Sequence, residues 1–447
     1  MSGLRAASAL LAAGVLAALS GGAAAGGTAL RPHDVTAATL APLAGPARAA
    51  RASAWCGSAQ QADVVPNAVA GFPVHWVYAL PADGADALAT VAATMQGDAE
   101  AIDAWWRSQD PTRTLRNDLA PLACGLQLDV TTLRLPQSSA QLALTEGRFA
   151  AIANALIAGG FRSPFVKYVV YYDGPVEEDN LCGQGASEGS GFGVAAVYVR
   201  SCAGVSTAAV AAHEVLHTLG AVSEGAPNEC GEPDDGHTCD DPNDLMYPSI
   251  DDSPLAAKAL DPGRDDYYGH GGGWPDAQDA PWLVQLDRQA PLALTVSGPG
   301  AVRADVPGLS CAQPCTTTWN SGTRLNLLPV AQPGAKLVRW NGACSGAALC
   351  ALTVSPGASV SALFAPAFFR LTVSIAGRGT VRSSRPGLTC RPRCAATFPS
   401  YEPVRLTAAP AKGWAFRRWG GSCRGSRPTC VVPMTAASRA VALFRRR

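Results

Sequence analysis

The sequence predicts a multidomain protein, in which an α+β domain is followed by two small all-β domains held together by disulfides. Three observations support this prediction. Helix-like and strand-like segments alternate up to residue 220, short β runs rich in Gly, Pro and Ser follow Pro291, and fourteen cysteines are spread along the chain. With 447 residues and 48% hydrophobic content, the chain can bury several cores, which excludes a disordered or fibrous protein.

The first residues have the features of a secretory signal peptide. Arg5 precedes an apolar run over residues 6–19, and a stretch of small residues ends at Ala25. We therefore expect residues 1–25 to be a signal peptide and the protein to be secreted. No apolar run reaches the roughly 20 residues that a membrane-spanning helix needs. Residues 26–53 are rich in Ala, Gly and Pro without periodicity, which predicts a linker or a short propeptide.

Residues 54–290 are expected to form the first folded domain. Clusters of β-branched and aromatic residues predict strands over residues 74–80, 126–135, 167–172 and 194–199. Apolar residues at helical spacing predict helices over residues 88–106, 145–158 and 206–219. The last of these helices is expected to end at Gly220, because glycine readily takes the left-handed conformation that ends a helix.

The cysteines favour disulfides over metal binding, because an exported chain folds in an oxidising compartment. Their spacing suggests seven local bridges: Cys56 with Cys124, Cys182 with Cys202, Cys230 with Cys239, Cys311 with Cys315, Cys344 with Cys350, Cys390 with Cys394, and Cys423 with Cys430. The four cysteines in each of the last two domains could also pair crosswise.

The segment after Pro291 is duplicated, which predicts two β domains over residues 291–366 and 367–447. Matching positions lie 79 or 80 residues apart: Cys311/Cys390, Cys315/Cys394, Trp340/Trp419, Cys344/Cys423, Cys350/Cys430 and Phe364/Phe444. Domains of about 75 residues bury little apolar surface, which explains two disulfides in each. The Trp-Gly turn, the Cys pairs and the closing Ala-Leu-Phe strand resemble the divergent internalin B-type repeats of bacterial exported proteins. That resemblance implies a stalk or adhesion module.

The formal net charge of zero conceals an asymmetry. Residues 366–447 carry 16 Arg or Lys and a single acid, Glu402. Such a surface can simply aid solubility, or it can bind an anionic cell-wall polymer or another surface partner, whereas we do not expect nucleic acid. The acidic residues concentrate between Asp173 and Asp287. They could form a solvated surface, or they could bind Ca²⁺ ions that stabilise the folded domain. The 31 Arg against 4 Lys indicate a bacterial, GC-rich source.

His213-Glu214-Val215-Leu216-His217 carries the predicted chemistry. Residues four apart lie on one face of a helix, so His213 and His217 can bind a single Zn²⁺. Glu214 would act as the general base that takes a proton from the attacking water. The pattern predicts a hydrolase with one catalytic zinc and a protein or peptide substrate.

The residues that follow resemble the metzincin family of zinc metalloproteases. Gly220 completes the pattern HExxHxxG, and Leu245-Met246-Tyr247-Pro248 is similar to the methionine turn of matrix metalloproteases. The resemblance implies a metzincin-like α+β catalytic domain, a zinc-dependent endopeptidase activity, and a position for Met246 beneath the metal. Gly220 would let the chain turn so that a third ligand reaches the zinc.

The third ligand is the point at which the sequence departs from the family. The family places it six residues after His217, where this chain has Ser223, a poor zinc ligand. We favour His237, because a bridge between Cys230 and Cys239 would hold it in a small loop near the metal. The alternatives are Glu224, Asp240, Asp244, a site with only two protein ligands, and no metal at all.

Two further alternatives follow from this departure. The chain could be a catalytically impaired adhesion or binding protein whose repeats carry the function, or a zinc amidase that acts on cell-wall peptides. The segment from Asp265 to His270 contains Tyr267 and Tyr268, which either belong to a structural loop or bring a tyrosine near the zinc to stabilise an oxyanion.

Overall fold

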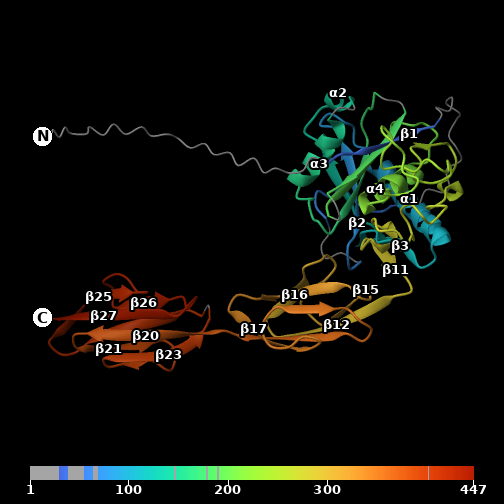
Figure 1. Cartoon of the computed structure of the whole chain (residues 1–447). Coiled ribbons are helices and arrows are strands. Elements are labelled where there is room, and N and C mark those ends of the chain that lie inside the picture. The colour runs from blue at the N-terminus through green and yellow to red at the C-terminus, as the bar shows by residue number, and fades with distance from the viewer. Residues whose placement is uncertain are drawn as a thin grey trace, which may run out of the picture.

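The computed structural model describes residues 30–38, 55–63, 69–144, 147–177, 180–188, 191–400 and 402–447. The expected signal peptide, residues 1–25, lies outside the described residues. Of the predicted linker or propeptide, only residues 30–38 are described, and they contain strand β1 (His33–Ala37). The chain is multidomain and mostly β, and its two C-terminal domains extend one after the other away from the N-terminal domain (Figure 1).

The N-terminal domain is built on a seven-stranded mixed sheet with the order β10-β1-β8-β9-β7-β2-β6. Strands β6, β2, β7 and β9 are parallel, and β8 runs antiparallel to both of its neighbours. The bounds are β2 Val74–Leu80, β6 Val130–Arg134, β7 Lys167–Tyr172, β8 Leu181–Ser187, β9 Gly193–Tyr198 and β10 Ser249–Ile250.

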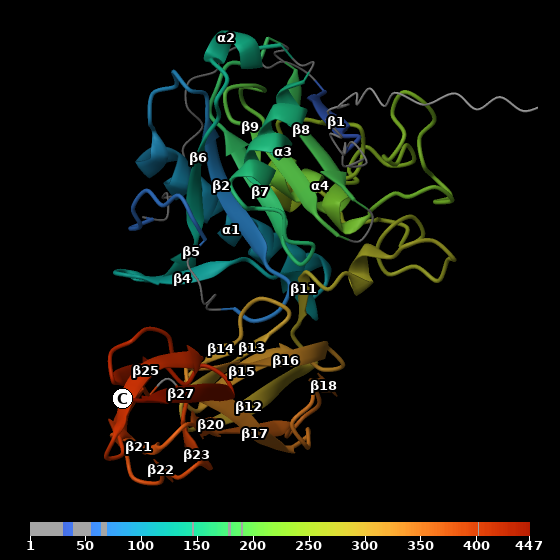
Figure 2. The same ribbon diagram turned by 90° about the vertical axis from the view of Figure 1, so that its left-hand side faces the viewer.

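Helices cover both faces of this sheet (Figure 2). On one face, α1 (Leu88–Gln109) and α4 (Thr207–Leu219) pack against Trp76 and Tyr78 of β2. On the other face, α3 (Arg148–Ala158) packs against Val77 and Ala79 of the same strand, with the short α2 (Ser139–Leu142) nearby. Alternate residues of a strand point to opposite faces, so one strand serves two cores. Smaller pairs complete the domain: β3 Arg113–Leu115 with β11 Leu283–Gln285, and β4 Leu119–Leu122 with β5 Gly125–Leu128.

The predicted strand over residues 126–135 is divided in the structure into β5 and β6, with Asp129 between them. Asp129 is 1% exposed and lies beside the buried His75 and Asp118, whose side chains are joined by a 2.9 Å hydrogen bond. A buried polar cluster of this kind has no signature in a hydrophobic pattern. Strand β8 was not predicted, because its sequence Leu-Cys-Gly-Gln-Gly-Ala-Ser is typical of a loop.

The two C-terminal domains share one topology, which accounts for the sequence duplication. Each consists of two four-stranded sheets, β15-β12-β19-β17 with β14-β13-β16-β18, and β23-β20-β27-β25 with β22-β21-β24-β26. In the first, the strands are β12 Gln289–Ser297, β13 Gly300–Ala304, β14 Ser310–Cys311, β15 Cys315–Asn320, β16 Arg324–Ala331, β17 Ala335–Gly342, β18 Cys350–Thr353 and β19 Ser359–Pro366. In the second, they are β20 Phe368–Ala376, β21 Gly379–Ser383, β22 Thr389–Cys390, β23 Arg393–Pro399, β24 Val404–Pro410, β25 Trp414–Gly421, β26 Thr429–Val432 and β27 Ser438–Arg446.

Corresponding residues occupy corresponding places in the two domains. Trp340 and Trp419 are both buried in the cores, and their indole N–H groups donate to the carbonyls of Ala348 and Arg427 at 2.9 and 3.0 Å. All seven predicted disulfides are formed, including the local rather than the crosswise pairing in both repeats. Seven disulfides indicate folding in an oxidising, non-cytoplasmic compartment. Among the described helices, none has the length and apolar character needed to cross a membrane.

The first C-terminal domain is hydrogen-bonded to the N-terminal domain. The guanidinium of Arg116, which is 3% exposed, donates to the side-chain oxygen of Asn320 at 2.9 Å and to the carbonyl of Ala70 at 2.7 Å. Asn320 in turn donates to the carbonyl of Leu283 at 2.8 Å. Burial lowers the pKa of Arg116 to about 10, so this side chain stays charged at neutral pH. The first repeat therefore has a defined attachment to the domain that carries the histidine helix.

Candidate metal centre

Helix α4 carries the two histidines of the HExxH motif. It begins after Ser206, whose hydroxyl accepts a hydrogen bond from the Ala209 N–H, and it ends at Gly220, which has φ +90°. Every residue from Ala208 to Leu219 is buried, so the helix runs through the core of the domain. The four-residue spacing places His213 and His217 on one face, with their Nε2 atoms 3.0 Å apart.

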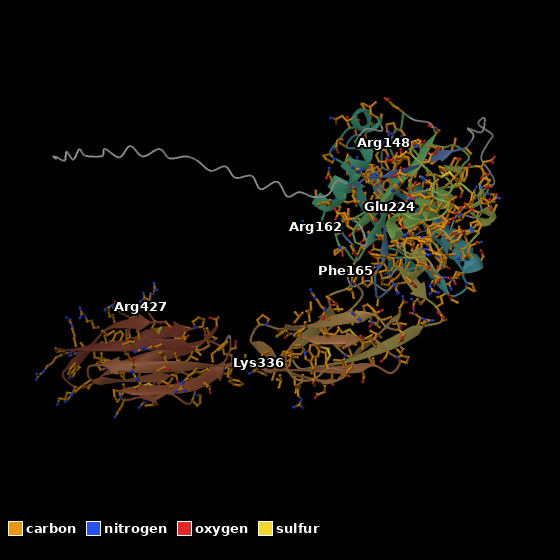
Figure 3. The ribbon with its side chains drawn as sticks, viewed as in Figure 1. Arg148, Arg162, Phe165, Glu224, Lys336 and Arg427 are labelled. Carbon is orange, nitrogen blue, oxygen red and sulfur yellow. A yellow bond between two sulfur atoms is a disulfide. The ribbon has the colours of Figure 1, made fainter. Side chains whose placement is uncertain are left out.

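His237 is the third member of this group. One ligating nitrogen from each of His213, His217 and His237 lies within 4.8 Å of the other two. The other candidates for the third ligand lie outside this group. Glu224 (Figure 3) and Asp240 are exposed. The Asp244 carboxylate is buried and accepts hydrogen bonds from Thr238, Met246 and Tyr267. The structure thus brings together the three histidines that the sequence favoured.

The Cys230–Cys239 bridge and the methionine turn hold His237 in place. The bridge spans nine residues, and within its loop the Cys230 N–H donates to the His237 carbonyl at 2.8 Å. The next residue, Thr238, donates its N–H to the Met246 carbonyl at 3.0 Å. The turn also reaches the helix, because His213 Nδ1 lies 2.6 Å from the Leu245 carbonyl. One buried turn therefore positions two of the three histidines.

In His213 and in His237, one ring nitrogen makes a hydrogen bond and the other is left for a ligand. His213 Nδ1 donates to the Leu245 carbonyl, so its Nε2 keeps a lone pair. His237 Nδ1 donates to the Asp234 carbonyl at 3.1 Å, and its Nε2 is buried and has no hydrogen-bond partner among the described residues. Both rings thus have the tautomer that a metal-binding imidazole needs.

Burial keeps the three imidazoles neutral. Desolvation lowers the pKa of His213 and of His217 well below the ordinary value, and it lowers the pKa of His237 to about 4. Histidine binds a metal only in its neutral form. Three neutral, converging imidazole nitrogens are a donor set that suits Zn²⁺, and they leave a coordination position for water or substrate.

Glu214 lies next to this group and is fully buried. Desolvation, followed by the negative charge of Asp34, raises the pKa of its carboxyl well above the ordinary value. Within the described part of the chain, neither carboxylate oxygen has a hydrogen-bond partner. Burying a carboxylate without hydrogen-bond partners costs folding free energy unless a bound group or water completes its surroundings. The position of Glu214 therefore favours a reactive role over a structural one.

Two glycines of β8 make room for Glu214. A Cβ atom at Gly183 would lie 2.6 Å from Glu214 Oε1, and one at Gly185 would lie 2.7 Å from Oε2. These distances are well below van der Waals contact, so only glycine lets the strand lie this close to α4. The bridge from Cys182 to Cys202 links the same strand to the segment that precedes α4. Sequence analysis missed these residues, although the Gly-x-Gly spacing within a cysteine-linked segment was a signal.

We expect Gly183→Ala in β8 to disturb the position of Glu214. The added methyl group should lower the free energy of unfolding by about 1–3 kcal/mol, the usual cost of overpacking a core, and should displace the Glu214 carboxylate. Thermal unfolding followed by circular dichroism measures the loss. Gly97→Ala is the matched control, because a Cβ atom there meets nothing within 4 Å and alanine favours the α1 helix. Equal stability of the two variants would show that the contact with Glu214 is not close.

Removing the Cys230–Cys239 bridge should weaken metal binding. The double change Cys230→Ser and Cys239→Ser frees the loop of His237, and we expect the affinity for Zn²⁺ to fall by about 10–100-fold, as for the loss of groups that orient a ligand. Competition with a chelating dye measures the affinity. The control is Cys423→Ser with Cys430→Ser in the second repeat, a bridge of similar span that should leave zinc affinity unchanged. Unchanged affinity in the first variant would mean that the loop is held without its bridge.

Tyr267 and Tyr268 are structural, so the hypothesis that one of them stabilises an oxyanion is not supported. Both are buried, and their hydroxyls donate to Asp244 at 2.5 Å and to Asp110 at 3.0 Å. The Asp244 carboxylate also accepts the Met246 N–H, so the hydrogen bond from Tyr267 stabilises the Leu245–Met246 turn. The Ca²⁺ expectation stays a prediction: the carboxylates of Asp261, Asp265 and Asp266 lie together, but Asp261 already accepts backbone N–H groups of the segment that follows it.

Comparison with known families gives a match in the last domain. Residues 371–447 match the divergent InlB B-repeat domain. This match agrees with the resemblance seen in the sequence, and it covers the second of the two duplicated domains. No curated protein matches the chain.

Comparison with solved structures gives only distant likenesses. The Bacillus anthracis TIE protein aligns at 7% identity and a TM-score of 0.25, covering 37% of this chain and 35% of that chain, so the chain spans about a third of that protein. A catalytically inactive OgpA from Akkermansia muciniphila, in complex with an O-glycopeptide substrate, aligns at 8% identity and a TM-score of 0.24, covering 86% of this chain and 98% of that chain. The major pilin T-13 of Streptococcus pyogenes aligns at 8% identity and a TM-score of 0.16, covering 35% and 96%. Scores this low do not establish a shared fold or function.

Proposed function

We propose that the chain is a secreted, zinc-dependent endopeptidase of the metzincin type. The observation that carries this proposal is the convergence of three buried, neutral imidazoles beside the buried carboxylate of Glu214. The Leu245–Met246 turn is hydrogen-bonded to His213 and to the loop of His237, which also supports the proposal. The α+β catalytic domain of this type would comprise residues 54–290.

His213, His217 and His237 would hold the zinc through one ring nitrogen each. When bound, Zn²⁺ supplies Lewis acidity that polarises a peptide carbonyl and makes a water molecule more acidic. Glu214 would take the proton from the attacking water and deliver it to the nitrogen of the leaving amine. Its buried site suits this role, because desolvation raises the pKa of the carboxyl and makes it a stronger base than an exposed glutamate.

The β domains would present or tether the catalytic domain. The second repeat carries 16 Arg or Lys and one acid over residues 366–447, and its projecting side chains, Arg427 among them, end largely in nitrogen (Figure 3). A surface of one sign attracts polymers of the opposite sign. An anionic cell-wall polymer or a surface partner is therefore the ligand that we propose for this domain. The match of residues 371–447 to a repeat domain also favours adhesion as a second role.

Cleavage of an unbiased peptide library by the purified protein tests the proposal. We expect cleavage that stops with a zinc chelator, returns when Zn²⁺ is added, and is lost in Glu214→Gln. The same protein should be incubated with purified cell-wall peptidoglycan, since cleavage of that polymer alone would identify a zinc amidase instead. A protein that retains zinc and cuts neither substrate, while its repeats bind a surface polymer, would be the catalytically impaired adhesion protein.

A further inference from the structure

One face of the second repeat carries arginines on all four strands of a sheet. The sheet is β23-β20-β27-β25 (Figure 1), and its inward residues form part of the core of the domain. Alternate residues of each strand therefore point outward to solvent. Five outward positions hold an exposed arginine: Arg393 on β23, Arg370 on β20, Arg439 and Arg445 on β27, and Arg418 on β25. We call these five residues the arginine face.

The register places the arginines of β20, β23 and β27 on the same side. Arg439 pairs with Thr372, and Arg393 pairs with Ser374. Paired residues point to one side of a sheet, and Arg370 lies on β20 at the same alternation as Thr372 and Ser374. All three arginines thus point outward together. From the spacing of strands and residues, the backbone positions of Arg370 and Arg439 lie about 8 Å apart.

The other two arginines continue this row along β27. Arg445 follows Arg439 on the same extended strand, about 20 Å further along. Arg418 pairs with Leu443, two residues before Arg445, so the backbone positions of Arg418 and Arg445 also lie about 8 Å apart. This spacing is about one Debye length at physiological ionic strength, so the potentials of neighbouring guanidinium groups add.

No acidic side chain offsets this charge in the described part of the second repeat. Glu402 is the only acid of residues 366–447, and it forms an ion pair with Arg385 at 2.5 Å. Arg385 lies between β21 and β22, which belong to the opposite sheet. The ion pairs of the described residues include no member of the arginine face. The face is therefore positive along its whole length.

The first repeat shows that the fold does not require these arginines. Its sheet β15-β12-β19-β17 has the same strand pairing. The residues at the five equivalent positions are Pro291, Pro314, Arg339, Ser359 and Ala365, so four of the five carry no charge. A surface of one sign also weakens the folded state through self-repulsion. Charges that the fold does not need, and that cost stability, point to a ligand.

We propose that the arginine face binds a linear phosphodiester polymer of the cell wall. The inference rests on the role proposed above for the second repeat and does not depend on peptidase activity. A guanidinium group donates two parallel hydrogen bonds to the oxygens of a phosphate group. In a phosphodiester polymer the charge belongs to the backbone and repeats regularly. Such a polymer can contact several arginines of the row at once.

The side chains between the arginines favour a polymer without bases. They are aliphatic or carry a hydroxyl group: Thr372, Ser374, Ala395, Val441 and Leu443. Among the described residues of this face, the exposed aromatic ring is Phe368, at the start of β20 and beyond Arg370. Proteins that bind single-stranded nucleic acid stack successive bases on aromatic rings. A single ring at the edge does not provide such a row.

Binding of synthetic poly(glycerol phosphate) to the full chain, measured by calorimetry at several salt concentrations, tests the proposal. The variant with Arg370→Gln, Arg439→Gln and Arg445→Gln removes three charges of the face and leaves polar side chains in their place. We expect the affinity to fall at least about tenfold. The slope of log Kd against log salt concentration should fall by about 2, because each phosphate contact releases about 0.7 counterion from a single-stranded polymer.

The matched control removes the same charge from elsewhere in the second repeat. Arg382 on β21 and Arg405 on β24 are exposed on the opposite sheet, and Arg427 (Figure 3) lies in the loop before β26. Changing these three residues to glutamine should leave the affinity within about twofold, because they lie beyond a Debye length from the face. An equal loss of affinity in the two triple variants would overturn the proposal, since net charge alone would then decide binding.

Further measurements separate the remaining outcomes. Single-stranded DNA or polyglutamate that binds as tightly as poly(glycerol phosphate) would overturn the assignment of the ligand. The triple variant of the face should unfold at the same temperature as the unchanged protein or at a higher one, and a lower temperature would show that the arginines stabilise the sheet instead. Because calorimetry needs no turnover, a protein that cleaves no peptide but binds the polymer through this face would refute the peptidase function and still support the inference.

Discussion

Glu214→Gln should lower the rate of peptide cleavage by about 10²–10⁴-fold, the usual contribution of a positioned general base. Glutamine has the same shape, so it fits between α4 and the two glycines of β8 and should leave the helix and its histidines in place. The amide accepts no proton from water, so the attack on the carbonyl loses its base. Steady-state cleavage of a library-derived peptide measures the change, and metal analysis of the same sample should show unaltered zinc.

Glu224→Gln provides the matched control. Glu224 is an exposed glutamate ten residues further along the chain, and it was one of the alternatives for the third ligand. Its replacement should change neither cleavage nor zinc content. If Glu214→Gln retained cleavage within about threefold of the unchanged protein, a range too small for a general base, another group would have to take the proton.

His237→Ala should cost the protein most of its affinity for zinc. Removing one of three protein ligands is a larger change than removing a group that orients a ligand, so we expect a loss of more than about 100-fold. Besides the hydrogen bond from Nδ1 to the Asp234 carbonyl, the imidazole leaves its Nε2 buried and bonded to no described residue, so this nitrogen is the atom that a metal would use. Competition with a chelating dye measures the affinity, and circular dichroism should show an intact fold.

Variants of the other candidate ligands make this result specific. Asp240→Asn and Glu224→Gln alter exposed side chains away from the three histidines, so both should bind zinc as the unchanged protein does. A zinc affinity that survives His237→Ala but falls in one of these two would assign the third ligand to that carboxylate. The result would also separate a three-ligand site from one with His213 and His217 alone.

Much of helix α4 could be predicted because its signals are local. The HExxH spacing, the glycine at its end and the amphipathic run all refer to residues within one helix, and α4 has nearly the predicted bounds. His237 could be proposed because two flanking cysteines marked a closed loop. The β repeats were evident because the chain contains the same pattern twice.

The walls of the site could not be predicted, because they depend on residues far apart in the sequence. Gly183 and Gly185 leave room for Glu214, which belongs to a helix distant in the sequence, and in isolation they are typical of a turn. His33, whose ring stacks on His217, belongs to a five-residue strand whose partners are 145 to 213 residues away, and its composition resembles a linker. The structural roles of Tyr267 and Tyr268 likewise depend on hydrogen bonds to the buried Asp244 and to the distant Asp110.

The most direct test of the central claim is a crystal structure of the zinc-loaded protein with diffraction data collected on both sides of the zinc absorption edge. We predict one anomalous peak per chain, within bonding distance of ring nitrogens of His213, His217 and His237, with Glu214 beside it. A peak in which His237 takes no part, or a zinc bound only at the Asp63–His75–Asp118–Asp129 cluster, would contradict the account.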